Sequence, residues 1–397
     1  MTTAAREPFP ARILTLLGGF VTVGGAERMT FAAFELFRER GSLVHCIVND
    51  WENEAIVAQA EKIGATWSEG SYKYRLRWRN RSFADAARGA FGTIATSRDL
   101  MRQVARWKPD VILAPDFEVV LRNAAALAFL RARGLPVVLY LQNAPPPSRR
   151  YQRLFRWIID PLVTHYATAS VHSARELEKI GIRASKISYV NNFAPSRGGA
   201  EPSVDRDPKK IVFVGQMIPQ KGLDILLDAF RIVAAHDPAA RLDVVSKKDG
   251  WIAPEYSAHR DSILSGVEDD DLRGRVTLMG WRDDVPRLLA RAAVHCSPSR
   301  PEMHEGMPLV CLEAKVAGTP TVAPAHGPFE ELITHRNDGW LCSDLSPASV
   351  AAGLRYFLDD PTRARAAGLA ARESSSRFSR SEFARRWEAV FAAMTKA

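Results

Sequence analysis

The sequence predicts an α/β protein with two doubly wound domains that face a central cleft. Short apolar stretches alternate with amphipathic ones, a polar segment interrupts this alternation at residues 194–210, and the alternation then restarts. Short, continuously apolar strands joined by helices are typical of parallel sheets that helices cover on both faces. The interrupting segment contains Pro195-Ser196-Arg197-Gly198-Gly199 and a charged run, a composition that favours an interdomain linker.

The 397 residues are enough for two or three domains of ordinary size. We expect a first domain at 1–195, a linker at 196–208, a second domain at 209–376 and a C-terminal helix within 377–397. Apolar runs predict strands of the first domain at 12–17, 43–48, 111–114 and 137–141, and helical spacing predicts helices at 26–40 and 124–133. The same signals predict strands of the second domain at 210–214, 241–245, 276–279, 294–296 and 321–323, and a last helix near 379–394.

The composition indicates a globular protein and limits the compartment and the partners that we expect. Hydrophobic residues make up 46% of the chain, which is normal for a globular protein with a full core. The four cysteines, Cys46, Cys296, Cys311 and Cys342, lack metal-ligand spacing, so we expect a reducing compartment and neither disulfides nor a zinc site. The net charge of +9 fits phosphorylated substrates, anionic lipid or nucleic acid and does not choose among them.

No apolar run reaches the roughly 18 residues that span a bilayer. Residues 13–26 resemble the apolar region of a signal peptide, but a strand followed by a Gly-rich turn and an amphipathic helix explains them better. We therefore expect a cytoplasmic protein.

The most informative stretch is 298–314, in which Glu305 and Glu313 stand on either side of seven residues that run from a Gly-containing loop into a helix. Pro308 occupies the expected first helical position, where its fixed φ and missing N–H cost nothing. The face that helical spacing predicts to be buried carries Leu309, Leu312 and Val316.

Glu313 flanks this face and needs a partner, because an unpaired buried charge is costly. Glu305 precedes the helix, where free backbone N–H groups favour anions. The stretch therefore predicts a site for hydroxyls and phosphate, and the alternative is a capped helix whose Glu313 meets an Arg or Lys.

Glycine-containing turns follow strands in both domains. Gly18 and Gly19 end the first strand, and Gly24-Gly25 opens the next helix. Such glycines let the backbone approach a ligand, and a helix N-terminus favours negative charge. A turn that binds nothing is the alternative for these positions.

In the second domain, Gly215 and Gln216 follow a strand and a helix begins near Gly222. Lys221 then stands at the helix entrance, where its ammonium group can meet a diphosphate, unless it is a solvated loop lysine. In the later loop Gly280-Trp281-Arg282-Asp283-Asp284, one of the two aspartates is expected to cap the next helix. Trp281 either stacks on a ligand or belongs to the core.

The spacing of Glu305 and Glu313 resembles the E-x7-E signature of family 4 of the retaining glycosyltransferases, which have the GT-B fold of two Rossmann-like domains. The resemblance is strong over 209–345, where the Gly–Lys loop, the Gly-Trp-Arg-Asp-Asp loop and Ser297-Pro298-Ser299-Arg300 precede the two glutamates, and it is weaker before that. In GT-B enzymes the last helix packs back on the first domain, so the resemblance implies this packing for 377–397.

The resemblance also implies roles for single residues. Glu305 would face the donor sugar, Glu313 would bind the ribose hydroxyls, and Lys221 would stabilise the departing diphosphate. The region around sugar and phosphate would be lined by the backbone amides of Gly306, Met307 and Leu309. The remaining predicted donor-binding residues are Gly18, Gly19, Gly25, Gly215, Gln216 and Trp281, the last against the nucleotide base.

The sequence departs from the family at two positions. The family has Arg where this chain has Gln216, which can hydrogen-bond phosphate but adds no charge, so Lys221 should carry more of the electrostatic load. Many relatives carry His where this chain has Gln142, which can orient a hydroxyl but cannot act as a base near neutral pH. In the front-face mechanism proposed for the family, the leaving phosphate oxygen takes the acceptor proton. The predicted catalytic residues are therefore Glu305, Lys221 and Gln142.

Two stretches, 72–83 and 149–159, combine arginines with aromatic residues. Both suit a membrane surface, where Arg meets anionic headgroups and Trp and Phe enter the interface. The alternative for each stretch is a solvated helix face above core aromatics. If the membrane interpretation holds, the protein works at the inner face of the cell membrane.

The resemblance implies a retaining hexosyltransferase that needs no cofactor other than its substrates. We expect it to be independent of metal, because no Asp/Glu cluster of metal-binding type is apparent. Its partners would be a nucleotide-sugar donor and a saccharide or lipid-linked saccharide acceptor in cell-surface polysaccharide or glycolipid assembly, and not nucleic acid. One alternative is a nucleotide-sugar epimerase of the same fold, for which we find no matching set of acid and base groups. Another is a non-enzymatic basic protein that binds lipid or nucleic acid, in which the two glutamates would have no role.

Overall fold

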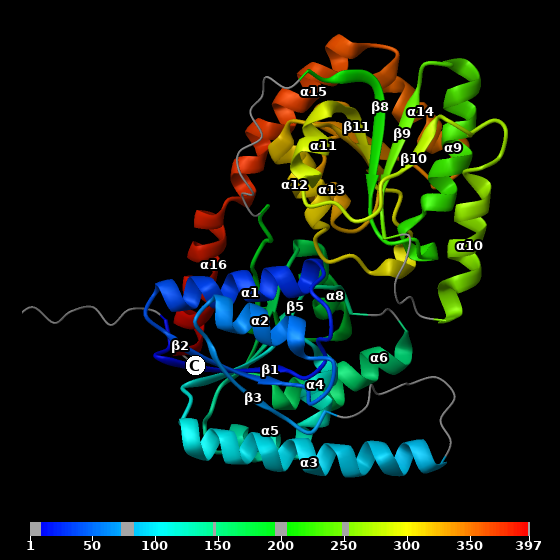
Figure 1. Cartoon of the computed structure of the whole chain (residues 1–397). Helices are drawn as coiled ribbons and strands as arrows, with labels where there is room; N and C mark the ends of the chain where they lie inside the picture. Colours follow the sequence, from blue (N-terminus) through cyan, green and yellow to red (C-terminus); the bar gives the residue numbers. More distant parts are fainter. Residues whose placement is uncertain (1–8, 73–82, 146–147, 195–204, 248–253, 396–397) are drawn as a thin grey trace, which may run out of the picture. The chain divides into compact units, whose positions relative to one another are not determined.

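The computed structural model describes residues 9–72, 83–145, 148–194, 205–247 and 254–395 (Figure 1). The chain divides into two compact units, a first unit of Met1–Asn192 with Ser381–Ala397 and a second unit of Phe193–Arg380. Most of the predicted linker and most of the basic stretch 72–83 lie outside the described residues.

The first unit is built on a seven-stranded parallel sheet with strand order β3-β2-β1-β4-β5-β6-β7. Its strands are β1 (Arg12–Leu17), β2 (Leu43–Val48), β3 (Thr66–Glu69), β4 (Val111–Ala114), β5 (Val137–Leu141), β6 (His165–Thr168) and β7 (Ile187–Tyr189). Its helices are α1 (Gly25–Glu39), α2 (Glu54–Lys62), α3 (Phe83–Trp107), α4 (Phe117–Arg122), α5 (Ala124–Ala132), α6 (Arg149–Leu154), α7 (Asp160–Leu162), α8 (Val171–Ile180) and the C-terminal α16 (Arg380–Thr395). The strand order reverses between β1 and β4, and in such sheets ligands bind beyond the carboxyl ends of the strands at the reversal.

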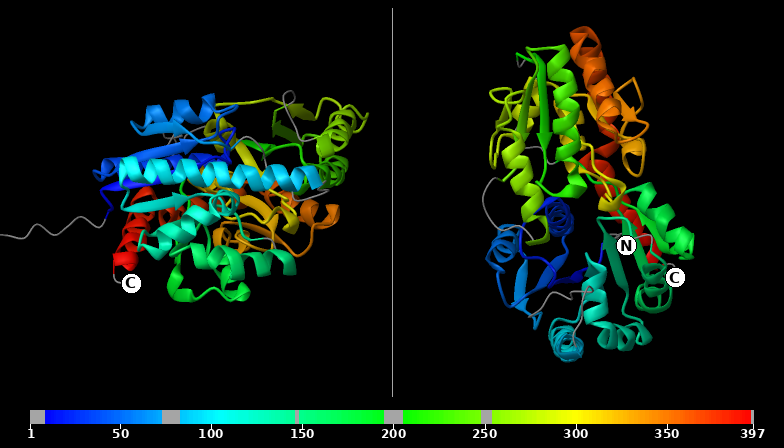
Figure 2. Two further views of the ribbon diagram at one scale, coloured as in Figure 1. Left: turned by 90° about the horizontal axis from the view of Figure 1, so that it is seen from below. Right: turned by 90° about the vertical axis from the view of Figure 1, so that its right-hand side faces the viewer.

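Helices cover both faces of this sheet, as its buried strands require. The long α3, cyan in Figure 2, runs along one face, where Leu100 shares a core cluster with Leu14 and Ile112 of the sheet. The C-terminal α16 belongs to the same unit, because the fully buried Trp387 packs edge-to-face against Phe37 and Tyr140, each at 4.9 Å between ring centroids.

The second unit is built on a six-stranded parallel sheet with strand order β10-β9-β8-β11-β12-β13. Its strands are β8 (Asp207–Val214), β9 (Arg241–Val245), β10 (Val276–Leu278), β11 (Ala292–Cys296), β12 (Thr321–Pro324) and β13 (Gly339–Cys342). Its helices are α9 (Leu223–His236), α10 (Ser257–Gly266), α11 (Val285–Arg291), α12 (Leu309–Ala317), α13 (Phe329–Leu332), α14 (Pro347–Leu358) and α15 (Pro361–Ser374). Here the order reverses between β8 and β11, so the loops after these two strands meet at the position that favours ligand binding.

Every strand predicted from an apolar run is present, and the predicted linker is wrong at its C-terminal end. β8 begins at Asp207, inside 196–208, because Asp207 already pairs with Ala292 of β11. Among the described residues, no helix is both long enough and apolar enough to cross a bilayer.

Candidate active site

The loop from β8 to α9 places Lys221 beside the segment that follows β11. After Gly215 and Gln216 the chain forms a 3₁₀ turn, Pro219–Lys221, and reaches Gly222 with a φ of +68°. A Cβ atom on Gly222 would lie 2.1 Å from the carbonyl oxygen of Pro298. Only glycine tolerates both this backbone conformation and this close approach, so Gly222 lets the two loops pack directly on each other.

Arg300 fastens these two loops together. Its guanidinium group makes two parallel hydrogen bonds to the carboxylate of Asp224, at 3.0 and 2.6 Å, and also donates to the carbonyl oxygen of Pro219. Its backbone N–H donates to the carbonyl oxygen of Gln220 at 2.8 Å. Burial raises the pKa of Asp224, but the hydrogen bonds and charge of Arg300 outweigh it and the net shift is downward. A bidentate pair of this kind fixes geometry as well as charge.

The side chains of Lys221 and Glu305 contact each other between the two loops that Arg300 joins. The ammonium nitrogen of Lys221 forms an ion pair with Oε1 of Glu305, and the hydroxyl of Ser299 donates to the same oxygen at 3.2 Å. The side chain of Glu305 is 9% exposed and that of Lys221 is 23% exposed. Lys221 is therefore not a solvated loop lysine, and its attraction to anions is stronger here than it would be in open solvent.

The side chains of Cys311 and His326 lie near the Lys221–Glu305 pair. Burial raises the pKa of Cys311 to about 12, so this thiol is neutral. Burial also lowers the pKa of His326, against the opposing influence of the Ser299 backbone and of nearby carboxylates that include Glu305. The Nε2 atom of His326 is buried without a hydrogen-bond partner among the described residues. The neutral imidazole of His326 can form a hydrogen bond with a hydroxyl group of a ligand.

Helix α12, which carries Glu313, differs from its prediction in two ways. Pro308 has a ψ of 112° and is the residue before the helix, so the first helical residue is Leu309. Val316 is 43% exposed rather than buried. The buried side of the helix instead carries Leu309, Cys311, Leu312, Ala314, Lys315 and Ala317. Glu313 is half-buried, and Gly306 and Met307 are buried just before the helix begins.

The buried face of α12 includes a lysine because Lys315 has a buried acidic partner. Its ammonium nitrogen lies 2.7 Å from Oδ2 of Asp338 and 2.8 Å from the hydroxyl of Ser374, and the two charged side chains are 3% and 1% exposed. Ser374 in turn donates to Asp338 at 2.9 Å. This network fixes α12, and with it the segment that follows Glu305, against the rest of the second unit.

Trp281 lies on the surface rather than in the core. Its side chain is 63% exposed, and the ammonium nitrogen of Lys247 lies 5.2 Å from the centroid of its ring. Asp284 occupies the position before α11, but its side chain makes no capping hydrogen bond. Its carboxylate instead pairs with Arg282 through two hydrogen bonds of 2.8 Å. The exposed indole is thus available for stacking on a flat ligand.

The predicted site residues of the first unit lie just after strands β1 and β5 or at the start of helix α1. A Cβ atom on Gly18 would lie 2.2 Å from the ring of Tyr72, so this glycine is required by internal packing. A Cβ atom on Gly19 would lie 3.2 Å from the carboxylate of Asp116, and Gly25 is the first residue of α1. Gln142 follows β5, is 7% exposed, and has an Nε2 atom without a hydrogen-bond partner in the described part of the chain.

The structure brings Lys221 and Glu305 together in the second unit and places Gln142, the third predicted catalytic residue, in the first. The contributions of Arg300, Asp224 and His326 were not predicted. For His326 a signal exists, because it follows β12 at the carboxyl end of the strand next to β11. Among the described residues, no group of three or more His, Cys, Asp or Glu side chains could hold a metal ion.

Comparisons with known proteins agree with this architecture. Residues 208–360 match the family described as glycosyl transferases group 1, and residues 23–196 match the family described as glycosyltransferase family 4. Together the two matches cover most of the chain.

Curated relatives match parts of the chain. An exopolysaccharide phosphotransferase of Streptomyces coelicolor is 31% identical over 216 residues, which are 54% of this chain and 21% of that protein. A D-inositol 3-phosphate glycosyltransferase of Kineococcus radiotolerans is 32% identical over 204 residues, which are 47% of this chain and 45% of that protein. The chain thus spans less than half the length of these relatives.

Solved structures match nearly all of the chain. HepE of Anabaena, solved with UDP and glucose, superposes with a TM-score of 0.76 at 20% identity and covers 95% of this chain and 98% of its own. A glycosyltransferase of Rickettsia africae superposes with a TM-score of 0.77 at 14% identity and covers 97% and 98%. These similarities confirm the predicted fold of two doubly wound α/β domains. With its GT-B fold and its matches to both family descriptions, the chain belongs to the glycosyltransferases of the family 4 type.

Proposed function

We propose that this protein transfers a sugar from a nucleoside diphosphate donor to a hydroxyl group of an acceptor, with retention at the anomeric carbon. The observation that carries the proposal is the Lys221–Glu305 pair, which is held between the loops after β8 and β11 at the reversal of the second sheet. The match to HepE, which was solved with UDP and glucose, supports a nucleoside diphosphate sugar as the donor class.

In the proposed mechanism the donor diphosphate takes the place of Glu305 at the ammonium group of Lys221. Lys221 then stabilises the negative charge that develops on the leaving phosphate oxygen, because a fixed cation in a shielded site needs no reorganisation. The released carboxylate of Glu305 accepts hydrogen bonds from the sugar hydroxyls.

Bond making and bond breaking occur on the same face of the sugar. The bond between the anomeric carbon and the phosphate oxygen breaks, and the acceptor oxygen forms a bond to that carbon. The acceptor proton passes to the leaving phosphate oxygen, so no protein base is required. Gln142 would orient the acceptor hydroxyl through its side-chain amide.

The remaining donor contacts follow the family resemblance. Trp281 would stack on the nucleotide base, and its 63% exposure supports this role. Glu313 would accept hydrogen bonds from the ribose hydroxyls. The backbone amides of Gly306, Met307 and Leu309 would bind sugar and phosphate.

The acceptor is proposed to be a saccharide or lipid-linked saccharide of cell-surface polysaccharide or glycolipid assembly at the inner membrane face. The similarity to a protein named exopolysaccharide phosphotransferase supports this class. The reaction is proposed to be independent of metal and cofactor, with Lys221 in the charge-neutralising role that a divalent cation would otherwise fill.

The test is transfer by the purified chain from UDP-, GDP- and ADP-sugars to saccharide and lipid-linked acceptors, with and without EDTA. We expect one donor to be used, an unchanged rate in EDTA, and a product whose anomeric coupling in NMR spectra matches that of the donor. An inverted product would contradict the retaining mechanism. Conversion of the sugar donor into an epimer without an acceptor would instead support the epimerase alternative.

A further inference from the structure

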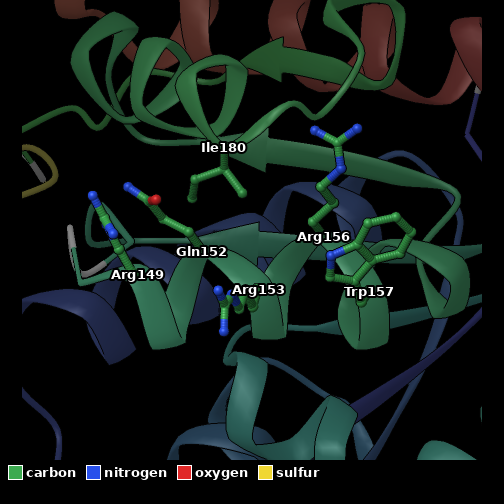
Figure 3. Close-up of a pocket in the computed structure, with 6 residues that line it drawn as sticks. All are labelled: Arg149, Gln152, Arg153, Arg156, Trp157 and Ile180. Carbon is green, nitrogen blue, oxygen red and sulfur yellow. The ribbon is translucent and has the colours of Figure 1, made fainter.

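A basic pocket lies in the first unit on the helical segment after β5. It has a volume of about 340 Å³ and is lined by Arg149, Gln152, Arg153, Arg156, Trp157 and Ile180 (Figure 3). The first four of these residues recur at the spacing that places side chains on one face of a helix. Ile180 comes from the end of α8 and forms the apolar side of the pocket.

A π-helical turn shapes this segment. Helix α6 continues directly into the turn Phe155–Ile159. Phe155 and Ile159 are fully buried, and the ring of Phe155 lies 5.4 Å from that of Phe117. Between these two anchors Trp157 is 69% exposed and Ile158 is 48% exposed. π-helical turns are rare and often occur at functional sites, and this one turns two large apolar side chains toward the solvent.

The segment carries an excess of positive charge. We use the name α6 face for Arg149, Arg150, Arg153, Arg156, Trp157 and Ile158. Within the described residues, none of its four arginines has a carboxylate within ion-pair distance. The carboxylate of the same segment, Asp160, is already paired with Lys186. The guanidinium group of Arg156 lies 5.4 Å from the centroid of the Trp157 ring, which places charge and apolar surface side by side.

We infer that the α6 face is a docking surface for a bilayer that contains anionic phospholipid. The pocket among the arginines would hold a lipid phosphate group, because a guanidinium group matches phosphate oxygens with two hydrogen bonds. Trp157 and Ile158 would enter the interface between headgroups and acyl chains. A site for a soluble anion would need the arginines but not the exposed apolar pair, so the combination favours a membrane.

The inference deepens the proposed membrane location by assigning it to one surface and one lipid chemistry. The experiment is co-sedimentation of the full chain with phosphatidylcholine vesicles, with and without phosphatidylglycerol, at low and high salt. No donor or acceptor is present, so a failure here leaves the proposed transfer reaction untouched. We expect binding only to the vesicles with phosphatidylglycerol, and weaker binding at high salt because salt screens the attraction.

Three variants separate the contribution of the arginines to vesicle binding from that of Trp157. The triple variant Arg149→Gln, Arg153→Gln, Arg156→Gln should weaken vesicle partitioning by about 100-fold, given the attraction of each arginine to an anionic surface. The variant Trp157→Ser should weaken it several-fold at low and high salt alike, because the lost contact is apolar. The matched control Arg291→Gln, Arg365→Gln, Arg372→Gln removes the same charge from exposed positions of the second unit and should bind nearly as well as the wild type.

Other outcomes would overturn the inference. It is wrong if the wild type stays in the supernatant at low salt, or if the triple variant and its control bind equally well while both retain their melting temperatures. Competition by glycerol 3-phosphate, with no loss of binding in Trp157→Ser, would identify a soluble anion site instead of a bilayer surface.

Discussion

Lys221 and Glu305 are 84 residues apart in the sequence and form an ion pair between two loops of the second unit. The ammonium group assigned to the donor diphosphate is thus held by the carboxylate assigned to the donor sugar. In the proposed mechanism the site is therefore close to neutral before the donor binds, and the donor replaces Glu305 as the partner of Lys221. Gly222 and Arg300 make the pair possible, because they pack the two loops together.

This pairing predicts opposite effects of two substitutions on the affinity for a free nucleoside diphosphate. Glu305→Gln should raise that affinity several-fold while lowering turnover, because Lys221 loses its competing carboxylate. Lys221→Ala should lower the affinity by roughly 10- to 100-fold, the effect of losing one hydrogen bond to a charged group. Calorimetry with UDP and steady-state kinetics measure the two quantities, and Lys179→Ala on the surface of the first unit is the control. Unchanged affinity and turnover in Glu305→Gln would remove Glu305 from the site.

Arg300 is predicted to be a positioning residue for Lys221. Arg300→Lys keeps the charge but cannot make two parallel bonds to Asp224, so the donor KM should rise by about tenfold with a smaller change in kcat. Asp224→Asn should add little further effect in the double variant, because both changes break the same pair. The matched control is Arg385→Lys, which disrupts a similar two-bond pair with Glu382 in α16. Equal kinetics for Arg300→Lys and the wild type would contradict the role.

Trp281 is predicted to bind the nucleotide base. Trp281→Ala should weaken UDP affinity by roughly five- to tenfold, since an aromatic stacking contact contributes about 1 kcal/mol. Trp281→Phe should retain most of the affinity, because it keeps a ring at this place. The control is Trp67→Ala, which removes a partly exposed indole from β3. Equal UDP affinity in Trp281→Ala and the wild type would exclude base stacking.

The fold was largely predictable because parallel strands buried on both faces leave continuous apolar runs in the sequence. The strands without such a prediction are β3, β6, β7 and β13. β3 and β7 form the edges of the first sheet, and the half-polar sequence Thr-Trp-Ser-Glu of β3 gives no apolar signal. In β6 the buried His165 is satisfied by a hydrogen bond to Ser188, a partner that the local sequence does not reveal.

The candidate site was predictable where its residues are neighbours in a motif and not where distant loops meet. Lys221 and Glu305 were predicted from their places at two helix entrances, and Glu313 from its spacing to Glu305. The bond between Arg300 and Asp224 joins residues 76 positions apart and has no local signature. Helical spacing predicts a buried Val316 only if the charged residues of the helix face the solvent. Lys315 is buried instead, because it pairs with Asp338.

The buried Lys315–Asp338 pair gives a prediction about stability. Lys315→Met leaves the carboxylate of Asp338 buried without its cation and should lower the free energy of unfolding by about 3–5 kcal/mol. Adding Asp338→Asn should restore part of the loss. The control Lys179→Met breaks a pair of the same 2.7 Å length with Glu176 on an exposed surface and should cost roughly 0.5 kcal/mol. Urea unfolding measures all three, and similar losses for the buried and exposed pairs would contradict the argument.

His295 gives a prediction about the dependence of stability on pH. It is fully buried in β11, one ring nitrogen lies 3.2 Å from the hydroxyl of Thr321, and burial lowers its pKa from 6.5 to about 3. At a pH between about 3 and 6.5, the unfolded chain therefore binds a proton at His295, whereas the folded chain does not. The contribution to stability is complete above pH 6.5 and is lost as the pH falls through this window, by roughly 1 kcal/mol per pH unit.

The corresponding measurement is urea unfolding of the second unit at a series of pH values from 7 down to about 4, the range in which this linkage acts. His295→Asn should make the free energy of unfolding less dependent on pH in this range, whatever its value at pH 7, because the titrating group is gone. His165 in the first unit has its pKa lowered to about 4 by burial and by the charge of Lys186, so its unfolding should show a similar slope that His295→Asn leaves unchanged. The control is His236→Asn, which removes a histidine whose side chain is 50% exposed. Equal slopes for His295→Asn and the wild type would show that His295 does not titrate on unfolding.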